Sequence, residues 1–245
     1  MRMTPIETID VVVLCGGRGK RLKKITQKVP KPMVEIGESP FLDILISTLA
    51  RFGFRRFILA MGYKSEMIKA HYKKHAENLN IVFSVEKKPL DTGGAVKKAK
   101  NFIKSNPFLV LNGDSFSQAN IPALLNFHSK KKALASVVLT QSTSAGDYGS
   151  IRCKRDGRIV SFAEKDKTAR SSLINAGIYV FDKKIFSLMP AQKKFSLERD
   201  FFPKMVVERF YGYPSKGGSL DIGTPLRLKK AKRFFKNLGL NIKER

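Results

Sequence analysis

The chain has no tryptophan and only two cysteines among its 245 residues. Cys15 and Cys153 cannot build a disulfide framework, which excludes the disulfide-rich secreted class and fits a reducing compartment. Long hydrophobic runs are also missing. The apolar run 11–15 follows Asp10 and is too short for a signal peptide, and no run approaches the length that spans a bilayer. We therefore expect a cytoplasmic protein without membrane insertion.

Acidic residues are scarce: 20 Asp and Glu stand against 47 Lys and Arg, a net charge of +27. Such an excess favours polyanionic partners such as nucleotides, phosphosugars, nucleic acids or acidic lipids. The basic residues are spread along the chain, with a mild concentration at 227–236, and no nucleic-acid recognition motif accompanies them. We expect most of them to cover solvated helix faces, and we expect no nucleic-acid partner.

Short apolar segments alternate with helical patterns through most of the chain, whose hydrophobic content of 42% is typical of a globular protein. Strands are expected at 10–15, 56–61, 81–85, 108–112, 135–140 and 173–181, and helices at 41–52, 65–75, 94–104, 121–131 and 224–238. This alternation predicts an α/β fold, a Rossmann-like, mostly parallel twisted sheet flanked by helices.

The pattern changes after Gly146, where residues 148–165 read as a hairpin that turns at Asp156-Gly157. We interpret this hairpin as a small β lobe for a substrate. No internal repeat or long linker occurs, so the sequence predicts a single domain.

A glycine-rich loop, LCGGRGKRL (14–22), follows the first predicted strand, at the place where open parallel sheets bind ligands. It is not a Walker A loop, because Leu14 stands where that motif needs glycine and Arg21 where it needs serine or threonine. It is not the dinucleotide fingerprint, because Leu22 occupies the third glycine position.

The loop nevertheless has the residues of a phosphate-binding turn. Gly16, Gly17 and Gly19 let backbone amides approach an anion, since no Cβ is in the way. Arg21 can add a forked contact, and Lys31 adds a point charge between two prolines that stiffen its segment. An ordinary turn with surface cations remains the alternative.

Further motifs follow this loop in a fixed order: KVPKPM (28–33), SVEKKPLDTGGA (84–95), FLVLNGD (108–114), YGSI (148–151), FAEK (162–165), INAGIYVF (174–181), FSLERD (195–200) and LDIGTP (220–225). Together they resemble the sugar-1-phosphate nucleotidylyltransferases over nearly the whole chain. Within that family the combination is most similar to the D-glycero-α-D-manno-heptose 1-phosphate guanylyltransferases.

The resemblance implies an enzyme that transfers a nucleotidyl group from a nucleoside triphosphate to a sugar 1-phosphate, with Mg²⁺ as cofactor. The acceptor phosphate is already an anion, so the task is to bring two anions together, which fixed cations and metal ions assist. The implied catalytic residues are Arg21, Lys31, Asp114 and Asp221, of which the two aspartates would hold the metal. A turn-forming Asp114 and a helix-capping Asp221 are the alternatives.

The nucleotide is expected between the glycine loop and residues 92–94, whose amides the family keeps free for the base. The implied nucleotide-binding residues are Leu14, Cys15, Gly16, Gly17, Gly19, Lys20, Glu86, Thr92, Gly93, Gly94, Asn112 and Gly113. One carboxylate can accept both N1–H and N2–H₂ of guanine, so Glu86 favours GTP. CTP remains an alternative nucleotide, because its base carries an amino group. A Glu86 that is simply a solvated charge is the other alternative.

The sugar phosphate is implied to contact Tyr148, Gly149, Glu164, Lys165, Asn175, Ala176 and Gly177. Neighbours in a strand point to opposite faces, so a bend is needed if residues 164 and 165 both act. We expect Glu198 and Asp200 to cap and charge the first turn of a helix, with a contribution to the sugar pocket as the alternative.

The expected domain of residues 1–245 then divides into a nucleotide-binding half (9–145), a sugar-phosphate-binding half (146–223) and a C-terminal helix (224–245). Lys20 stands where most relatives carry threonine, and Asp91 replaces a frequent glycine near the base or ribose.

The expected product is a GDP-sugar for lipopolysaccharide or capsule assembly. A second hypothesis is an enzyme of the same fold that uses CTP, UTP or dTTP with another sugar phosphate, such as mannose or glucose 1-phosphate. A third is a catalytically silent relative that binds nucleotide sugars. A homodimer is compatible with the sequence.

Overall fold

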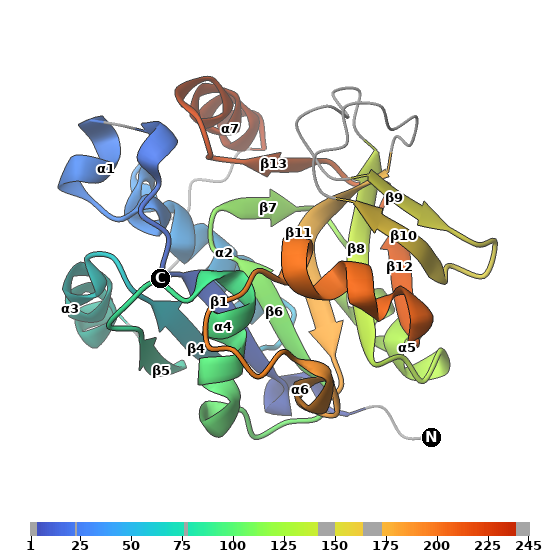
Figure 1. The fold of residues 1–245 in the computed structure, drawn as a ribbon. Helices are drawn as coiled ribbons and strands as arrows, with labels where there is room; N and C mark the ends of the chain where they lie inside the picture. Colours follow the sequence, from blue (N-terminus) through green and yellow to red (C-terminus); the bar gives the residue numbers. More distant parts are fainter. Residues whose placement is uncertain (1–3, 23, 76–77, 142–149, 164–172, 239–245) are drawn as a thin grey trace.

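A central sheet of seven strands organises the computed structural model, which describes residues 4–22, 24–75, 78–141, 150–163 and 173–238 (Figure 1). Its order is β12-β8-β11-β6-β1-β4-β5. The strands are β1 (Asp10–Cys15), β4 (Arg56–Met61), β5 (Asn80–Val85), β6 (Phe108–Asn112), β8 (Ala135–Gln141), β11 (Leu173–Phe181) and β12 (Phe210–Pro214). Only the pairings of β11 are antiparallel. The predicted Rossmann-like, mostly parallel sheet is thus confirmed.

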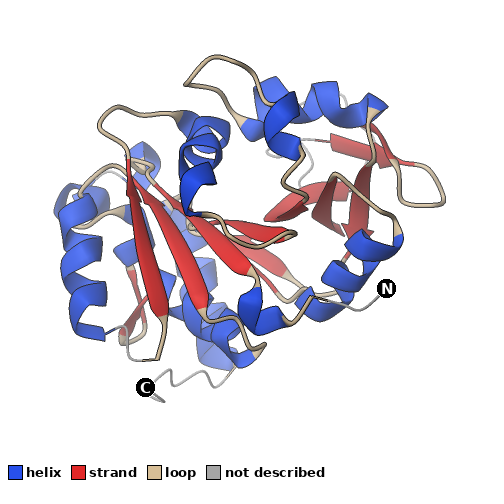
Figure 2. Ribbon diagram, turned by 90° about the horizontal axis from the view of Figure 1, so that it is seen from below, coloured by secondary structure: helices blue, strands red, loops and turns tan. Residues whose placement is uncertain are grey.

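Helices cover both faces of this sheet (Figure 2). They are α1 (Lys24–Lys28), α2 (Phe41–Arg51), α3 (Ser65–His75), α4 (Asp91–Ala99), α5 (Ile121–Lys130), α6 (Ile185–Leu188) and α7 (Pro225–Asn237). Helices α2, α3 and α5 pack against one face, and α4 and α6 against the other. Residues of β1 alternate between the two cores, which is why that strand reads as a continuous apolar run.

Six short strands complete the fold: β2 (Glu35–Ile36), β3 (Ser39–Pro40), β7 (Ser115–Ser117), β9 (Ser150–Cys153), β10 (Ile159–Ala163) and β13 (Ser219–Asp221). Strands β9 and β10 form the predicted hairpin, which turns at Asp156-Gly157 with a φ of +88° at Gly157. Strand β13 pairs with β7 and leads into α7.

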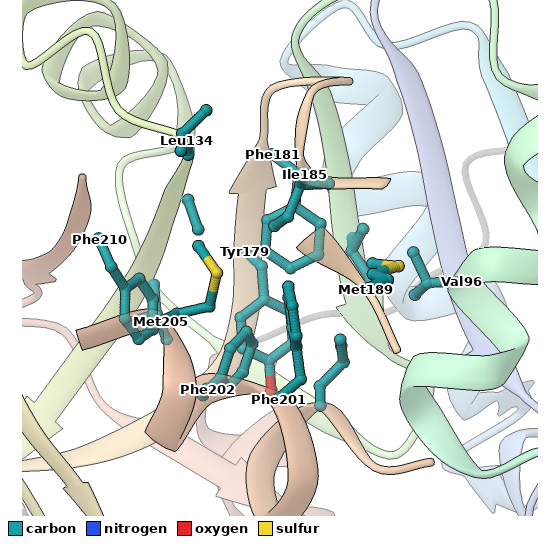
Figure 3. Packing of buried hydrophobic residues seen from close by; sticks show 14 of the residues in the cluster. Val96, Leu134, Tyr179, Phe181, Ile185, Met189, Phe201, Phe202, Met205 and Phe210 are labelled. Carbon is teal, nitrogen blue, oxygen red and sulfur yellow. The ribbon is translucent and has the colours of Figure 1, made fainter. Parts of the chain in front are cut away.

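An aromatic cluster fixes the segment 195–207 over β11 (Figure 3). This segment contains the π-turn η6 (Leu197–Phe201) and the 3-10 helix η7 (Phe202–Val207). The ring of Phe202 lies 5.3 Å from that of Tyr179 and 5.2 Å from that of Phe210. All three residues are buried, so the cluster holds η6 against the sheet and the N-terminus of α4.

Two predictions of local structure are corrected. Strand β12 was not predicted, because Gly212 and Pro214 within it are turn signals; an edge strand tolerates them. Helix α4 begins at Asp91 instead of Gly94 and ends at Ala99, before a 3-10 turn at 100–102. The glycines of its first turn are weak helix formers, and tertiary packing overrides their propensity.

Candidate active site

The loop after β1 packs closely at both ends and is open in the middle. Gly19 has a φ of +60°, and a Cβ there would lie 3.2 Å from the Cβ of Lys31. A Cβ on Gly16 would lie 2.8 Å from Oε1 of Glu86, whereas nothing described lies within 4 Å of one on Gly17. The middle of the loop therefore presents accessible backbone, as a phosphate-binding turn requires.

Lys31 and Asp114 form an ion pair beside this loop, in which the Lys31 ammonium donates to Oδ2 of Asp114. The Lys31 side chain is 9% exposed and that of Asp114 is 37% exposed. Ser115 donates to the other carboxylate oxygen at 3.2 Å. Burial alone would raise the pKa of Asp114, but Lys31, Ser115 and Arg21 hold that pKa below its ordinary value. Asp114 is therefore a partly exposed anion.

Asp221 approaches the same place through the pairing of β13 with β7. The Ile222 amide donates to the carbonyl of Asp114 at 3.0 Å, so the backbones of the two predicted metal ligands are adjacent. The Asp221 carboxylate is 14% exposed, accepts from the Gly223 amide at 2.7 Å and pairs with Arg227 at 3.1 Å. Sequence reasoning did not predict Arg227, which holds this carboxylate.

Arg21 is the fourth member of this group. A Cβ on Gly223 would lie 3.2 Å from Nη2 of Arg21, and the charge of Arg21 reaches Asp114. The N-cap of α7 is Thr224, whose side chain accepts from the amide of residue 227. Asp221 thus shapes the turn before α7 without being its cap. The four predicted catalytic residues are neighbours.

A cleft of about 760 Å³ opens beside these groups, a size typical of small-molecule sites. Eleven predicted site residues line it: Leu14, Cys15, Gly16, Gly17, Gly19, Lys20, Lys31, Glu86, Thr92, Asn112 and Asp114. The predicted residues that the structure describes but that do not line it are Arg21, Gly93, Gly94, Gly113, Asn175, Ala176, Gly177 and Asp221.

Glu86 follows β5 and lines one wall of the cleft. Its Oε2 accepts from the Leu90 amide at 3.3 Å, and a Cβ on Gly62 or Gly16 would lie within 2.8 Å of its Oε1. Two glycines therefore leave room for this side chain. Burial raises the pKa of Glu86, the Leu90 amide opposes that rise, and the charge of Asp91 adds to it. A half-buried carboxylate in the cleft argues against an ordinary solvated charge.

The amides of Gly93 and Gly94 are not free, contrary to the prediction. Both donate to the carbonyl of Phe195, at 2.9 and 3.1 Å. A Cβ on Gly93 would lie 2.2 Å from the Phe195 ring, and one on Gly94 would lie 2.2 Å from the Lys193 carbonyl. The close approach of segment 193–195 therefore requires both glycines, and any contact with nucleotide stays a prediction.

Glu198 joins α4 to β11 through a polar network. Thr92 and Ser196 donate to its Oε2 at 2.7 and 2.8 Å, and the Tyr179 hydroxyl donates to its Oε1 at 3.1 Å. Asn175 donates to the Tyr179 oxygen at 2.8 Å. The network thus connects Thr92, a predicted nucleotide contact, with Asn175, a predicted sugar contact.

Capping of η6 involves one predicted residue, Asp200, and one residue that was not predicted, Ser196. The hydroxyl of Ser196 accepts from the amides of Glu198 and Arg199, while Asp200 accepts from the Ser196 amide at 2.7 Å. Both predicted carboxylates lie in the first turn of η6, and the capping role is confirmed for Asp200. Glu198 does not cap the turn, because its carboxylate is the centre of the network described above.

The start of β11 bends beside the end of β6. Its register shifts between Asn175 and Tyr179, and Gly177 has a φ of +76° with its amide bonded to the Asn175 side chain at 2.9 Å. A Cβ on Gly177 would lie 3.0 Å from Nδ2 of Asn112. Among the described residues, Oδ1 of Asn112 is buried without a hydrogen-bond partner. Ala176 points into the core.

Gly113 serves the packing of β6 against β1. Its amide donates to the carbonyl of Leu14 at 3.0 Å, and a Cβ there would lie 2.6 Å from that oxygen. Four other predicted residues, Tyr148, Gly149, Glu164 and Lys165, lie outside the described residues.

The comparison with protein families decides what this arrangement is. The nucleotidyl transferase model matches residues 10–237, which include every group described above. The chain belongs to the nucleotidyl transferase family. The resemblance found in the sequence is thereby confirmed, and this chain is an enzyme of the nucleotidyltransferase class.

Individual relatives resemble this nucleotidyl transferase over most of its length. It is 34% identical over 226 residues to D-glycero-alpha-D-manno-heptose 1-phosphate guanylyltransferase of Aneurinibacillus thermoaerophilus, which covers 92% of this chain and 97% of that one. The Campylobacter jejuni protein of the same name is 38% identical over 190 residues, 78% of this chain and 83% of that one. Mannose-1-phosphate guanylyltransferase of Mycobacterium tuberculosis is 33% identical over 221 residues, 89% of this chain but 62% of that one.

A solved structure gives the same result. HddC from Yersinia pseudotuberculosis, complexed with GMP-PN, has a TM-score of 0.81 and 35% sequence identity over 93% of this chain and 99% of that one. This likeness supports both the fold and the family.

The cleft of this transferase also includes residues that were not predicted as site residues: Arg18, Pro32, Pro89, Asp91, Ala95, Ser196 and Arg199. Arg18 was recognisable from its place in the glycine loop. Arg199 was not, because only the folded chain brings η6 to α4, where Arg199 pairs with Asp91 at 3.4 Å. In the described part of the chain, every helix is too short or too polar to cross a membrane.

Proposed function

We propose that this transferase joins the GMP part of GTP to D-glycero-α-D-manno-heptose 1-phosphate and releases pyrophosphate. The observation that carries the proposal is the Lys31–Asp114 pair beside open loop backbone, in one cleft with Glu86. Two relatives with 34% and 38% identity bear the name of this activity, and the related HddC structure holds GMP-PN.

The chemistry needs charge stabilisation and no base. A phosphate oxygen of the sugar 1-phosphate forms a bond to the α-phosphorus of GTP, while the bond from that phosphorus to the bridging oxygen breaks and pyrophosphate leaves. Charge accumulates on the leaving group, where fixed cations are effective. Lys31 is buried and lies on the cleft wall, so its charge is weakly screened by water. Exposed Arg18 and Lys20 would receive the outer phosphates.

Guanine is the base that suits Glu86. Its N1–H and N2–H₂ are adjacent donors that a single carboxylate accepts together, whereas uracil and thymine offer one donor between two carbonyls. Glu86 is held by the Leu90 amide on one oxygen and lies over Gly16. This support favours a fixed carboxylate at the cleft wall, as base reading requires.

The residues present fit Mg²⁺. The ion prefers one or two carboxylates together with phosphate oxygens and water, and Asp114 and Asp221 are the two carboxylates whose backbones lie adjacent. In the described part of the chain, no cluster of three or more His, Cys, Asp or Glu residues forms a complete protein site, which agrees with an ion bound jointly with nucleotide. When bound, Mg²⁺ would neutralise charge on the triphosphate.

Mannose 1-phosphate is the second candidate acceptor. Mannose-1-phosphate guanylyltransferases match 87% to 89% of this chain at 33% to 34% identity, close to the values for the heptose enzymes. A catalytically silent relative is disfavoured, because Lys31 and Asp114 are both in place in the cleft.

Pyrophosphate release tests the proposal. Each of the four nucleoside triphosphates is paired with heptose, mannose and glucose 1-phosphates, and GTP with the heptose is expected to give the highest kcat/KM. Chelation of divalent ions and Asp114→Asn should each abolish release, with the folded state checked by circular dichroism. Preference for another triphosphate or sugar would contradict the substrate assignment, and full activity in chelator would contradict the metal.

A further inference from the structure

Asp91 occupies a left-handed backbone conformation, which glycine adopts freely and which aspartate adopts at some cost. It is the first residue of α4 and has a φ of +56°. This left-handed region strains residues that carry a Cβ, less so Asp and Asn than other residues, whereas glycine adopts it without that strain. The sequence resemblance expects glycine at this position, so the aspartate of this chain needs a physical reason.

The contacts of Asp91 within the protein do not supply that reason. Among the described residues, its carboxylate makes one ion pair, with Nη2 of Arg199 at 3.4 Å. The two side chains are 37% and 58% exposed, and an ion pair this accessible to water contributes little to stability. The pair therefore holds the carboxylate in place without compensating for the strained backbone.

The position of Asp91 points to a ligand instead. Three carboxylates line the cleft: Glu86, Asp91 and Asp114. Phosphates offer only acceptors and negative charge, so a carboxylate must face a group that donates. Asp114 accepts from Lys31, and Glu86 is the proposed partner of the base. The donors of a nucleoside triphosphate that are still unmatched are the ribose 2′ and 3′ hydroxyls.

Two observations place Asp91 at the nucleoside end of the cleft. Leu90 donates its amide to Glu86, so Asp91 is the residue directly after a contact of the proposed base reader. The charge of Asp91 also helps to raise the pKa of Glu86, which requires the two carboxylates to be near each other. A ribose is attached to the base, so it lies within the same neighbourhood.

We propose that Asp91 is a specificity-determining residue that accepts hydrogen bonds from the ribose hydroxyls, with Arg199 as the positioning residue that orients its carboxylate. The guanidinium also offsets the negative charge of Asp91, which would otherwise repel the triphosphate. The proposal rests on the proposed function in that a nucleotide occupies this cleft with its base beside Glu86, but it does not require that base to be guanine.

Ribose selectivity in Asp91→Gly is the test. The kcat/KM values of the best triphosphate and of its 2′-deoxy and 3′-deoxy analogues are compared. A hydrogen bond to a charged acceptor corresponds to roughly a tenfold to hundredfold preference for the ribonucleotide, which should fall to about one in Asp91→Gly, mainly through KM. Asp91→Asn keeps an acceptor and tolerates the left-handed conformation, so it should retain part of the preference.

Thermal unfolding separates this role from a structural one. Glycine relieves the strain, so Asp91→Gly should unfold at the same or a higher temperature than the wild type while its selectivity is lost. Lys132→Gly is the matched control: this exposed residue has a φ of +46° outside the cleft, and its replacement should change stability alone. Arg199→Gln should weaken the ribose preference more than Arg199→Lys does.

Three outcomes would overturn the proposal: an unchanged ribose preference in Asp91→Gly, no preference in the wild type, or a loss of stability that parallels the loss of activity. A wild type inactive with every substrate pair would contradict the proposed function instead. In that case the same comparison is made from the rise in unfolding temperature caused by GTP and by 2′-deoxy-GTP, so the ribose assignment is still decided.

Discussion

Single residues of this site differ most in how far each charge is withdrawn from water. Lys31 and Lys20 both border the cleft, but Lys31 is buried between two prolines and bound to Asp114, whereas Lys20 is exposed. Coulomb interactions strengthen as water is excluded, so the charge of Lys31 interacts more strongly with a bound anion than the equal charge of Lys20 does. We therefore propose that Lys31 acts on the reacting phosphate and that Lys20 helps to capture the triphosphate.

Glu86→Gln tests base reading. Glutamine can accept only one of the two guanine donors with its oxygen and presents an NH₂ to the other, so kcat/KM for GTP should fall by roughly tenfold or more relative to UTP. The exposed Glu66, whose side chain is 80% exposed, provides the control substitution Glu66→Gln, which should leave the ratio unchanged. An unchanged ratio in Glu86→Gln would show that Glu86 does not read the base.

The raised pKa of Glu86 adds a pH signature. When a carboxyl group has a higher pKa in the folded state than in the unfolded state, the protein becomes less stable as the pH rises through the folded-state pKa. Acidification restores that stability. At neutral pH Glu86→Gln should therefore be at least as stable as the wild type. Acidification protonates Glu86 and should therefore raise KM for GTP in the wild type. Because the pKa of Glu86 is raised, this rise in KM should begin at a higher pH than an ordinary glutamate would give. The same rise should be missing in Glu86→Gln. Parallel pH profiles would contradict this.

Among the elements, the strands buried on both faces were the most predictable. β1, β4 and β6 read as continuous apolar runs because a helix layer covers each face, and their predicted bounds coincide with the observed ones. β12 was missed because its glycine and proline break that signal. An edge strand needs only one paired side and one covered face, so its sequence is less constrained.

The contact of η6 with α4 was beyond sequence reasoning. It joins Leu197 to Thr92 across 105 residues, and nothing local in either motif indicates the partner of the other. The glycines of DTGGA were predicted to keep their amides free, whereas the structure uses them for the close approach of Phe195 and its neighbours. A sequence motif can thus locate a segment at the cleft correctly without showing why its residues are glycines.

Gly93→Ala should destabilise the protein for this reason. The new Cβ would lie 2.2 Å from the buried Phe195 ring, and overpacking of this kind typically costs about 1–3 kcal/mol, or roughly 2–12 °C in unfolding temperature for a chain of this size. Gly17→Ala is the control, because a Cβ there meets nothing described within 4 Å. Its unfolding temperature should stay near that of the wild type. Equal stability of the two variants would show that segment 193–195 yields easily.

On the scale of the whole molecule, sheet direction explains where the site gathers. The residues that follow β1, β5 and β6 lie at one edge because these strands are parallel, as the sequence rule for open sheets predicts. β11 runs the opposite way, so its early residues, including Asn175 and Gly177, lie beside the end of β6. The predicted sugar contacts Asn175 and Gly177 thus stand near the start of a strand, where the rule would not look for them, and only the family motif pointed to them.

The excess positive charge has a consequence at the same scale. Helix α7 begins four residues after Asp221, at Pro225, and carries exposed lysines at 229, 230 and 232. A field of this sign attracts a triphosphate before contact and is screened by salt within about 10 Å at 0.1 M. We therefore expect kcat/KM for the triphosphate to fall severalfold between 20 and 200 mM salt, because electrostatic steering of this kind changes association rates by about tenfold or more.

Reversing the three lysines of α7 to glutamate tests that field without altering the cleft. Each reversal lowers the net charge of +27 by two, so kcat/KM at low salt should decrease and its salt dependence should flatten, while kcat stays the same. Replacement of the same three residues by arginine keeps the charge and should reproduce the wild-type salt curve. Identical curves for the glutamate and arginine variants would mean that only the cations of the cleft act on the nucleotide, and that the remaining charge serves another purpose.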